Sequence, residues 1–444
     1  MITYTETRRH ALDKLRMMMI DGHLAANQRS VDAGCSVRVH EGGYWGFAAS
    51  PTAEVAELQA QARRNAGAMA RFGARAKPPL PGGVYRGEHQ FDGKPQLSAK
   101  ECSDRLAELH AHCKRLYPGL RATRFLLHQE QHTKHVSTSH GADAHIGIQR
   151  AGFAMWLLAL DERGLPIEVC EPLSGRGGVA DRDLSVQTLA PRIDELHTHL
   201  QAKRHAVPAR GGLHTVVLAP ALAGMLAHEA MGHPCEADLV LGGAVTADLV
   251  GQRVASELIT MVDFAHHALG QETLIPVYAD DEGTPARDAV LIERGLLKDF
   301  MSSRETAQAL GLQPTGSARA YSPHDEPLVR MRNTAILPGT SQLGDMIAGV
   351  EDGYLLMTTT NGQADSTTEF MFGVSLGYEI RGGRVGRAIR DTTLSGNAIQ
   401  ALQTVDAVSD DMHWSCSGYC GKKQPMVVSM GGPALRARAH LGGE

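Results

Sequence analysis

Residues 226–240 read Leu-Ala-His-Glu-Ala-Met-Gly-His-Pro-Cys-Glu-Ala-Asp-Leu-Val. Within them, His228, Glu229 and His233 form the pattern His-Glu-x-x-x-His. Neutral imidazole is a good zinc ligand, and a glutamate beside a zinc-bound water is a good general base. The pattern therefore predicts a metal site with two histidine ligands and a glutamate base. The alternative is a helix C-terminus whose two histidines face the negative end of the helix dipole.

The spacing of the two histidines constrains the local backbone. Positions i and i+5 lie about 140° apart on a helix of 3.6 residues per turn, so a regular helix cannot aim both side chains at one ion. Either the turn widens, or the helix ends between the histidines. Gly232 and Pro234 favour the second alternative. We therefore expect His228 and Glu229 on the last helical turn and His233 on the unwound exit.

A third zinc ligand has to come from outside this pair, because catalytic zinc has three protein ligands and one open position. The nearby candidates are Cys235, Glu236 and Asp238, and the distant ones are Cys416 and Cys420. A thiolate is a strong zinc ligand. The two carboxylates have a second interpretation, in which they orient the histidines or only solvate a loop.

The stretch resembles the signature of the TldD/PmbA family of zinc metallopeptidases, in which a strand and an apolar helix lead into His-Glu-Ala-x-Gly-His and an acidic pair. Gly418-Tyr419-Cys420-Gly421-Lys422 resembles the family's C-terminal Cys-Gly-Lys segment. The cysteine of that segment is the family's third zinc ligand, so the resemblance implies Cys420 here.

Two further elements extend the resemblance, Arg330-Met331-Arg332-Asn333-Thr334 and Gly362-Gln363-x-Asp365. Candidates to orient the ligands or to contact substrate are Glu236, Asp238, Arg330, Arg332 and Asn333. The chain departs from the family pattern at Pro234-Cys235 and Asn361, and these departures concern the substrate pocket.

The resemblance implies a zinc-dependent metallopeptidase that hydrolyses peptide bonds of unfolded or leader-bearing peptides, with Glu229 as general base. It also implies a homodimer, or a heterodimer with a sister subunit that lacks the metal motif. One alternative is an amide hydrolase or amide-rearranging enzyme of small-molecule biosynthesis. Another is a non-catalytic partner subunit with a structural zinc, closed by Cys235 or Cys416.

Composition gives limits on partners and compartment. The 444 residues have a net charge of −5, 43% hydrophobic and 21% charged residues, all ordinary for a globular protein. This charge gives no reason to expect nucleic acid or a membrane as a partner. No signal peptide is recognisable, and seven cysteines without a repeating framework favour reduced thiols, so we expect a cytoplasmic protein.

The apolar pattern predicts an α+β protein with an N-terminal α/β domain, residues 1–208, and a β-rich, largely antiparallel catalytic domain, residues 209–444. The predicted helices pass through Leu12, Leu15 and Met19, begin at Ser50-Pro51, follow the capping box Ser98-x-x-Glu101, and run through Leu189–Leu200 and Glu305–Leu310. The predicted strands are Ser36–His40, Tyr44–Ala49, a meander within Arg121–Glu171, Thr215–Ala219, Leu274–Tyr278, a hairpin within Leu291–Phe300, Leu355–Thr360 and Phe370–Ile380.

The meander carries five histidines, His128, His132, His135, His140 and His145. A second metal site is conceivable there. We expect instead a polar sheet face or cleft wall, because the spacings do not repeat a ligand pattern.

Overall fold

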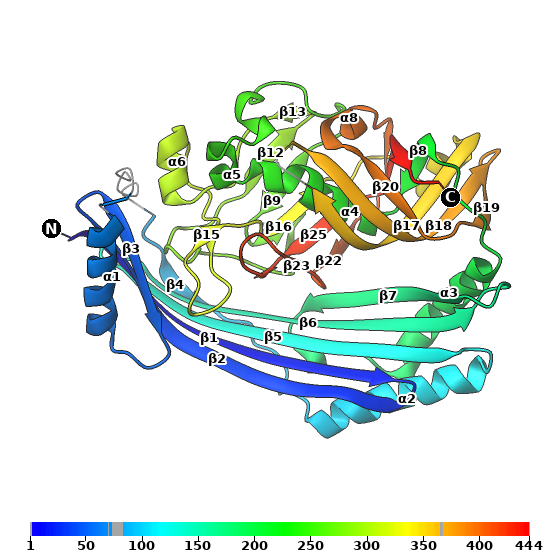
Figure 1. Ribbon diagram of the computed structural model, residues 1–444, viewed down its shortest axis with the longest axis horizontal. Coiled ribbons are helices and arrows are strands. Elements are labelled where there is room, and N and C mark those ends of the chain that lie inside the picture. Colours follow the sequence, from blue (N-terminus) through cyan, green and yellow to red (C-terminus); the bar gives the residue numbers. More distant parts are fainter. Residues whose placement is uncertain (1, 70, 73–82, 365–366, 444) are drawn as a thin grey trace.

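The structure is a computed structural model that describes residues 2–69, 71–72, 83–364 and 367–443. Asp365 of the Gly-Gln-x-Asp element lies outside the described residues. Figure 1 shows a long N-terminal sheet along one side and the C-terminal half lying against it. The predicted α+β class is confirmed, whereas the α/β arrangement expected for the N-terminal domain is wrong, because its sheet is antiparallel except for one strand pair.

The N-terminal sheet has strand order β3-β2-β1-β5-β6-β4, and β7 pairs with β6. Its neighbouring strands are antiparallel except for β4 with β6. The strands are β1 (Ile2–Ile20), β2 (His23–Glu41), β3 (Tyr44–Ser50), β4 (Arg86–His89), β5 (Ala122–Thr138), β6 (Asp143–Leu160) and β7 (Pro166–Arg176). The helices of this half are α1 (Val55–Met69), α2 (Ala99–Leu116), a 3-10 turn η1 (Val179–Asp181) and α3 (Val186–Arg204).

The helix predicted through Leu12, Leu15 and Met19 is wrong, because these residues lie on strand β1. β1 pairs along almost its whole length with β2 and β5, so sheet hydrogen bonds determine its conformation. The apolar residues also face different sides. Leu12 packs with residues of the C-terminal half, whereas Met19 packs under α2 and α3. Because the strand is buried on one face near Leu12 and on the other near Met19, its apolar residues have the sequence spacing that is typical of a helix.

Several other predictions are confirmed in the N-terminal half. Ser98 and Glu101 form the capping box of α2, the meander is β5–β7, and α3 covers the predicted Leu189–Leu200. The helix expected from Ser50-Pro51 begins later, at Val55. The Ser50 hydroxyl accepts hydrogen bonds from the N–H groups of Thr52 and Ala53, so it closes a turn and does not cap the helix.

The C-terminal half contains a closed five-strand barrel, β17-β8-β26-β20-β18, in which β17 also pairs with β18. Closure removes free edges around most of the ring. The barrel strands are β8 (Gly212–Leu218), β17 (Asp352–Ala364), β18 (Glu369–Arg381), β20 (Thr392–Asn397) and β26 (Leu435–Leu441), with β19 (Arg384–Ala388) and β21 (Ala407–Val408) attached to them. The expected strands at Thr215–Ala219, Leu355–Thr360 and Phe370–Ile380 are confirmed as parts of β8, β17 and β18.

A second sheet of this half has the order β13-β12-β9-β16-β25-β22. It consists of β9 (Met261–Phe264), β12 (Ala289–Glu293), β13 (Leu296–Leu297), β16 (Asn333–Ile336), β22 (His413–Ser415) and β25 (Ser429–Gly432). The hairpin expected within Leu291–Phe300 is confirmed as β12–β13. The strand expected at Leu274–Tyr278 is wrong, because that segment forms bends and irregular backbone. Asn333 binds both backbone groups of Ile275 and so replaces a strand partner.

Short elements complete this half. The helices are α4 (Pro220–Leu226), α5 (Ala237–Leu241), η4 (Val245–Asp248), α6 (Arg304–Leu310), α7 (Leu343–Ala348) and α8 (Ala398–Gln403), and the two-stranded ladders are β10 (His267–Ala268) with β11 (Gln271–Glu272), β14 (Ala318–Arg319) with β15 (Leu328–Val329), and β23 (Tyr419–Cys420) with β24 (Met426–Val427). Across the described residues, none of the helices combines the length and hydrophobicity needed to cross a bilayer.

The two halves share one buried core. Val136, Ile146 and Ile148 of the long sheet belong to the same hydrophobic cluster as residues of α4 and the barrel. Buried ion pairs cross the same interface, including Lys134 with Asp281 at 2.7 Å. A rigid sheet thus supports the C-terminal half along one face.

The contact between α1 and the sheet generates a prediction. A Cβ at Gly46 of β3 would lie 2.0 Å from the backbone oxygen of Ala62 in α1. Gly46→Ala should therefore lower the free energy of unfolding by about 1–3 kcal/mol through overpacking. Gly67→Ala in α1 is the control, because a Cβ there meets nothing within 4 Å. The control should be neutral or stabilise by about 1 kcal/mol. Urea unfolding of both variants measures the difference, and equal stabilities would contradict the packing argument.

Candidate metal centre

The two motif histidines lie on a widened helical turn. Helix α4 continues directly into a π-helical turn, η2 (Ala227–Gly232), and then into a 3-10 turn, η3 (His233–Cys235). The N–H of His233 donates to the carbonyl of His228, which is the i to i+5 bond of a π turn. The expected unwound exit is therefore wrong. The turn widens instead, and the two imidazole centroids lie 5.3 Å apart.

Gly232 is needed for close packing and not for an unusual backbone angle. Its φ of −63° and ψ of −53° are ordinary helical values. A Cβ at this position would lie 2.3 Å from Sδ of Met331, which is fully buried. The small residue lets the element around Met331 pack directly on the widened turn.

Cys420 completes a group of three ligand-type side chains. Its Sγ lies 3.4 Å from Nε2 of His233, and one ligand atom from each of His228, His233 and Cys420 lies within 4.8 Å of the others. Cys420 is on the short strand β23, and its carbonyl accepts a hydrogen bond of 2.6 Å from the buried guanidinium of Arg330. The same guanidinium binds the carbonyl of Gln424 at 2.6 Å. Arg330 therefore holds both Cys420 and Gln424 in the segment of residues 416–424, here called the cysteine loop.

The three side chains alter one another's charge. Burial would raise the pKa of the Cys420 thiol, but hydrogen bonds from His228 and His233 outweigh burial and lower this pKa to about 3. Burial would lower the pKa of His233, but Cys420 and Glu236 outweigh it and raise this pKa to about 10. The cysteine is therefore held as a thiolate, the form that binds metals.

Glu229 lies beside this group. Its carboxylate is 3.6 Å from Nε2 of His233 and 4.0 Å from Nε2 of His228. The side chain is 19% exposed, whereas that of His228 is almost completely buried. On its other side is strand β17, where a Cβ at Gly362 would lie 3.4 Å from Cγ of Glu229. The carboxylate thus lies between the ligand-type atoms and a barrel strand, with access to solvent.

The acidic pair after the motif is connected to the histidines. Glu236 is fully buried, and its Oε2 accepts from Nδ1 of His233 at 2.8 Å. When His233 is neutral, as a metal ligand must be, this bond keeps the proton on Nδ1 and leaves Nε2, the atom nearest Cys420, free. Lys422 lies between the two acids, 3.2 Å from Glu236 and 2.9 Å from Asp238. Glu236 therefore contacts His233 directly, whereas Asp238 is connected to Glu236 through Lys422.

Family models match this chain in two places. Residues 211–441 match the PmbA/TldA metallopeptidase C-terminal domain, and residues 13–69 match PmbA/TldA metallopeptidase domain 1. The chain belongs to the PmbA/TldA metallopeptidase family.

Curated relatives agree with this family. A zinc metalloprotease TldD homolog of Saccharolobus solfataricus is 34% identical over 287 residues, which span 64% of this chain and 62% of the relative. A metalloprotease of Methanothermobacter thermautotrophicus is 29% identical over 100% of this chain and 96% of its own length. Among solved structures, TldE from Thermococcus kodakarensis has a TM-score of 0.76 at 18% identity, covering 98% of this chain and 96% of that one, and so shares the fold.

The remaining sequence candidates lie outside the group of three. Arg332 is fully buried, and its guanidinium binds Asp263 at 2.7 Å together with backbone carbonyls. Asn333 binds only backbone groups of neighbouring segments among its described contacts. Cys235 and Cys416 are buried, and neither belongs to a metal-type group among the described residues. Burial raises the pKa of both thiols, which keeps them protonated.

The long sheet holds the cysteine loop through a network that sequence reasoning missed. Arg150 on β6 lies opposite Glu130 on β5, and both side chains are buried. Arg150 donates to the carbonyls of Cys416 and of Gly418, the latter at 2.7 Å. Glu130 accepts from the hydroxyl of Tyr419 at 2.6 Å. The only available signal was a pair of charges at inward-facing positions of two strands.

Three of the five meander histidines have structural contacts, as expected for a polar sheet face or cleft wall. His132 is buried 3.1 Å from His10, His128 packs over Gly152, and His140 binds Arg304 at 3.1 Å. His135 and His145 lie on the outer face of the sheet with Asp143.

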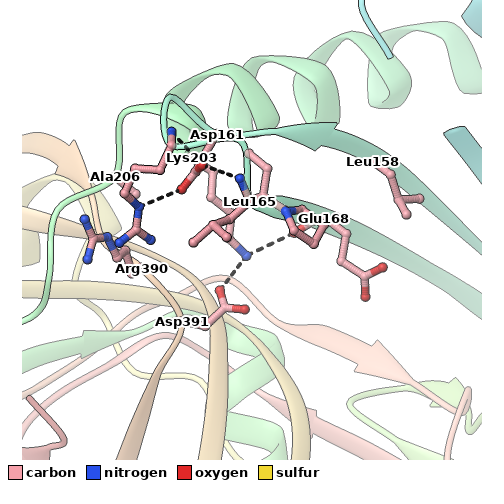
Figure 2. A pocket seen from close by; sticks show the side chains of 11 residues that line it. Leu158, Asp161, Leu165, Glu168, Lys203, Ala206, Arg390 and Asp391 are labelled. Carbon is pink, nitrogen blue, oxygen red and sulfur yellow. Dashed lines mark hydrogen bonds and ion pairs between the residues drawn. The ribbon is translucent and has the colours of Figure 1, made fainter. Parts of the chain in front are cut away.

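A cavity of about 430 Å³ lies elsewhere, between the β6–β7 turn, the end of α3 and the segment after β19 (Figure 2). Its charged side chains are already paired. Lys203 donates to the carbonyl of Glu168 and lies 2.5 Å from Asp391, and Arg163 binds Asp161. This cavity therefore lacks an available charge for a ligand of its own.

Packing on the widened turn gives one prediction. Gly232→Ala would press a methyl group against Met331, so we expect it to destabilise the protein by about 1–3 kcal/mol and to weaken zinc retention. Gly344→Ala, in helix α7, is the control, because a Cβ there meets nothing within 4 Å. Thermal unfolding and bound zinc are measured for both. Met331→Ala should restore zinc to the Gly232→Ala protein, and failure to do so would show that the contact is not the cause.

The network of Arg150 and Glu130 gives a second prediction for this site. Lysine cannot reproduce the forked contacts of Arg150, so Arg150→Lys should speed zinc loss to a chelator by on the order of tenfold. Arg124→Lys is the matched control on the same sheet, since Arg124 pairs with Glu168 at the partly exposed surface. Equal zinc release from the two variants would contradict a role of the network in holding Cys420.

Proposed function

We propose that this protein is a zinc-dependent peptidase in which His228, His233 and Cys420 hold the metal and Glu229 is the general base. One observation carries the proposal. Two imidazoles and a thiolate converge within 4.8 Å, and a partly exposed carboxylate lies beside them. Family membership and the names of the curated relatives agree with this activity.

The residues present fit zinc. Thiolate and imidazole are its usual protein ligands, and the low pKa of Cys420 supplies the thiolate. Nδ1 of His228 is buried without a hydrogen-bond partner among the described residues, so a polar atom of the group is still unsatisfied. The group has three members, which leaves a coordination position for substrate or water. A closed structural site would need a fourth donor such as Cys235 or Cys416, and these lie outside the group.

Zinc, when bound, polarises the scissile carbonyl and acidifies the attacking water. Glu229 accepts the proton of that water through its carboxylate and then delivers it to the leaving amine. Its solvent exposure and its place between the histidines and β17 allow both transfers. Glu236 orients His233 through Nδ1, so that Nε2 faces Cys420, and Lys422 forms an ion pair with Glu236.

An extended peptide is the substrate that this geometry favours. Strand β17 pairs with β8 only through residues 353–356. From Thr358 to Ala364 it has one described partner, β18, and this segment passes Glu229 at Gly362. A peptide added as a strand beside β17 would bring its backbone carbonyl to the metal. Because strand addition needs unpaired backbone, we infer unfolded or leader-bearing peptides as substrates.

Assembly and compartment follow from the same proposal. We infer a homodimer, or a heterodimer with a sister subunit that lacks the metal motif; the fold shared with TldE is compatible with either. A thiolate ligand needs a reducing environment, and the seven cysteines are free, so we infer a cytoplasmic protein.

Metal content and activity of matched variants test the proposal. The wild type and Glu229→Gln should each bind about one tightly held zinc per chain, whereas His228→Ala and Cys420→Ser should lose it. Glu229→Gln should cleave an unfolded peptide about 10²–10⁴-fold more slowly than the wild type. Cys416→Ser is the control, a buried cysteine outside the group, and should keep both zinc and activity.

Two outcomes would contradict the proposal. If Cys420→Ser keeps its tightly held zinc, the third ligand is wrong. If Glu229→Gln cleaves peptides as fast as the wild type, Glu229 is not the base. A panel of small amides, tested beside the peptides, separates peptidase activity from small-molecule amide hydrolysis.

A further inference from the structure

The outer face of the long sheet carries a second group of ligand-type side chains. His135 on β5 lies directly opposite His145 on β6, and Asp143 precedes His145 by two residues. Alternation along a strand places all three on the same face. One ligand atom from each lies within 4.8 Å of the others. This face is opposite to the one that packs on the C-terminal half, because Ala144 and Ile146 point into the shared core.

Both imidazoles of this group approach the same carboxylate oxygen. The imidazole rings are stacked with centroids 4.1 Å apart, and Nε2 of each ring points to Oδ1 of Asp143, at 2.7 Å for His135 and 3.7 Å for His145. A hydrogen bond to one histidine explains the first distance. The second imidazole has no such explanation, and its approach to the same oxygen brings three potential ligand atoms of a shared cation together.

The surroundings add both signs of charge. Glu88 on β4 lies opposite His145, and Arg86 lies opposite Asp143. Arg9 lies opposite His135. The Arg86 Nε donates to the carbonyl of Gly141, which draws that guanidinium toward the turn. Glu88 accepts a hydrogen bond of 2.8 Å from Gln90 and lies outside the group of three.

We propose that His135, Asp143 and His145 bind a divalent transition-metal ion at a site separate from the catalytic centre. Two imidazoles and one carboxylate suit zinc, nickel or copper better than magnesium or calcium, which prefer oxygen ligands. His135 and His145 also line a cavity of about 490 Å³, together with Arg9, Cys35, Gln90 and Thr133. The cavity leaves room for a solvent molecule or a side chain of another molecule to complete the coordination.

To bind such an ion, the ligand atoms need small shifts and at least one imidazole ring has to rotate, because the lone pairs of stacked rings lie in parallel planes. Ligands about 2.0–2.2 Å from a tetrahedral ion lie roughly 3.4 Å from one another. The 2.7 Å contact has to lengthen and the 3.7 Å contact to shorten, each by less than 1 Å. The side chains are 37%, 49% and 61% exposed for His135, His145 and Asp143, so they are free to rotate. Binding at Nε2 of His135 requires that this nitrogen carry no proton, so the proton of its hydrogen bond to Asp143 passes to solvent or, by tautomerisation, to Nδ1.

Equilibrium dialysis of the full-length, tag-free protein against excess zinc tests the proposal. The wild type should bind about two zinc ions per chain, and His145→Ala and Cys420→Ser about one each. The double variant should bind none. His205→Ala is the matched control, an exposed histidine 2.6 Å from Glu162 without a second histidine in a metal-type group among the described residues. It should bind as much as the wild type.

Copper gives a second readout that does not depend on zinc stoichiometry. In the Cys420→Ser background, electron paramagnetic resonance of bound Cu²⁺ should show nitrogen ligands, and this signal should disappear with His135→Ala or His145→Ala. Equal zinc binding by each parent and its His145→Ala variant would overturn the proposal. Because each comparison is made within one background, the result does not depend on whether Cys420 holds the catalytic metal.

Discussion

The i to i+5 hydrogen bond between His233 and His228 is the constraint on which the candidate metal centre depends. Without the extra residue in the turn, the two imidazoles would point about 140° apart. A π turn is rare compared with an α turn, so the neighbours that pack on it matter. Here Met331 packs on Gly232, and the alanines of the turn are fully buried in the shared core. The ligand geometry is therefore a consequence of core packing.

The third member of the group makes the site depend on the whole chain. Cys420 is separated from His233 by 187 residues, and it lies on a ladder of only two short strands. Such a loop has few ladder hydrogen bonds of its own. Arg330 from the C-terminal half and Arg150 from the long sheet bind its carbonyls instead. The N-terminal sheet thus takes part in the site, although it contributes none of the three ligand-type side chains.

The sequence predicted the chemical group better than the backbone that carries it. Residue types and the Cys-Gly-Lys resemblance identified His228, His233 and Cys420, which the structure brings together. The same sequence offered glycine and proline after the motif, and these favoured a helix end. Gly232 turned out to serve packing against Met331, a contact that local sequence does not record. Leu12 and Met19 predicted a helix for a similar reason, because the sequence does not record that they face opposite sides of strand β1.

The roles of Arg150 and Arg330 could not be predicted from the sequence, because both side chains bind backbone carbonyls of segments that are distant in the chain. Arg150, Arg304, Arg330 and Arg332 are among the largest fully buried side chains of the protein. The hydrogen bonds of Arg330 and Arg332 go mostly to backbone carbonyls in segments without regular pairing. A planar guanidinium presents five donors in a fixed fork, so one side chain can replace several missing strand hydrogen bonds. Arg330 and Arg332 therefore connect backbone segments, and their positions depend on which loops meet in three dimensions.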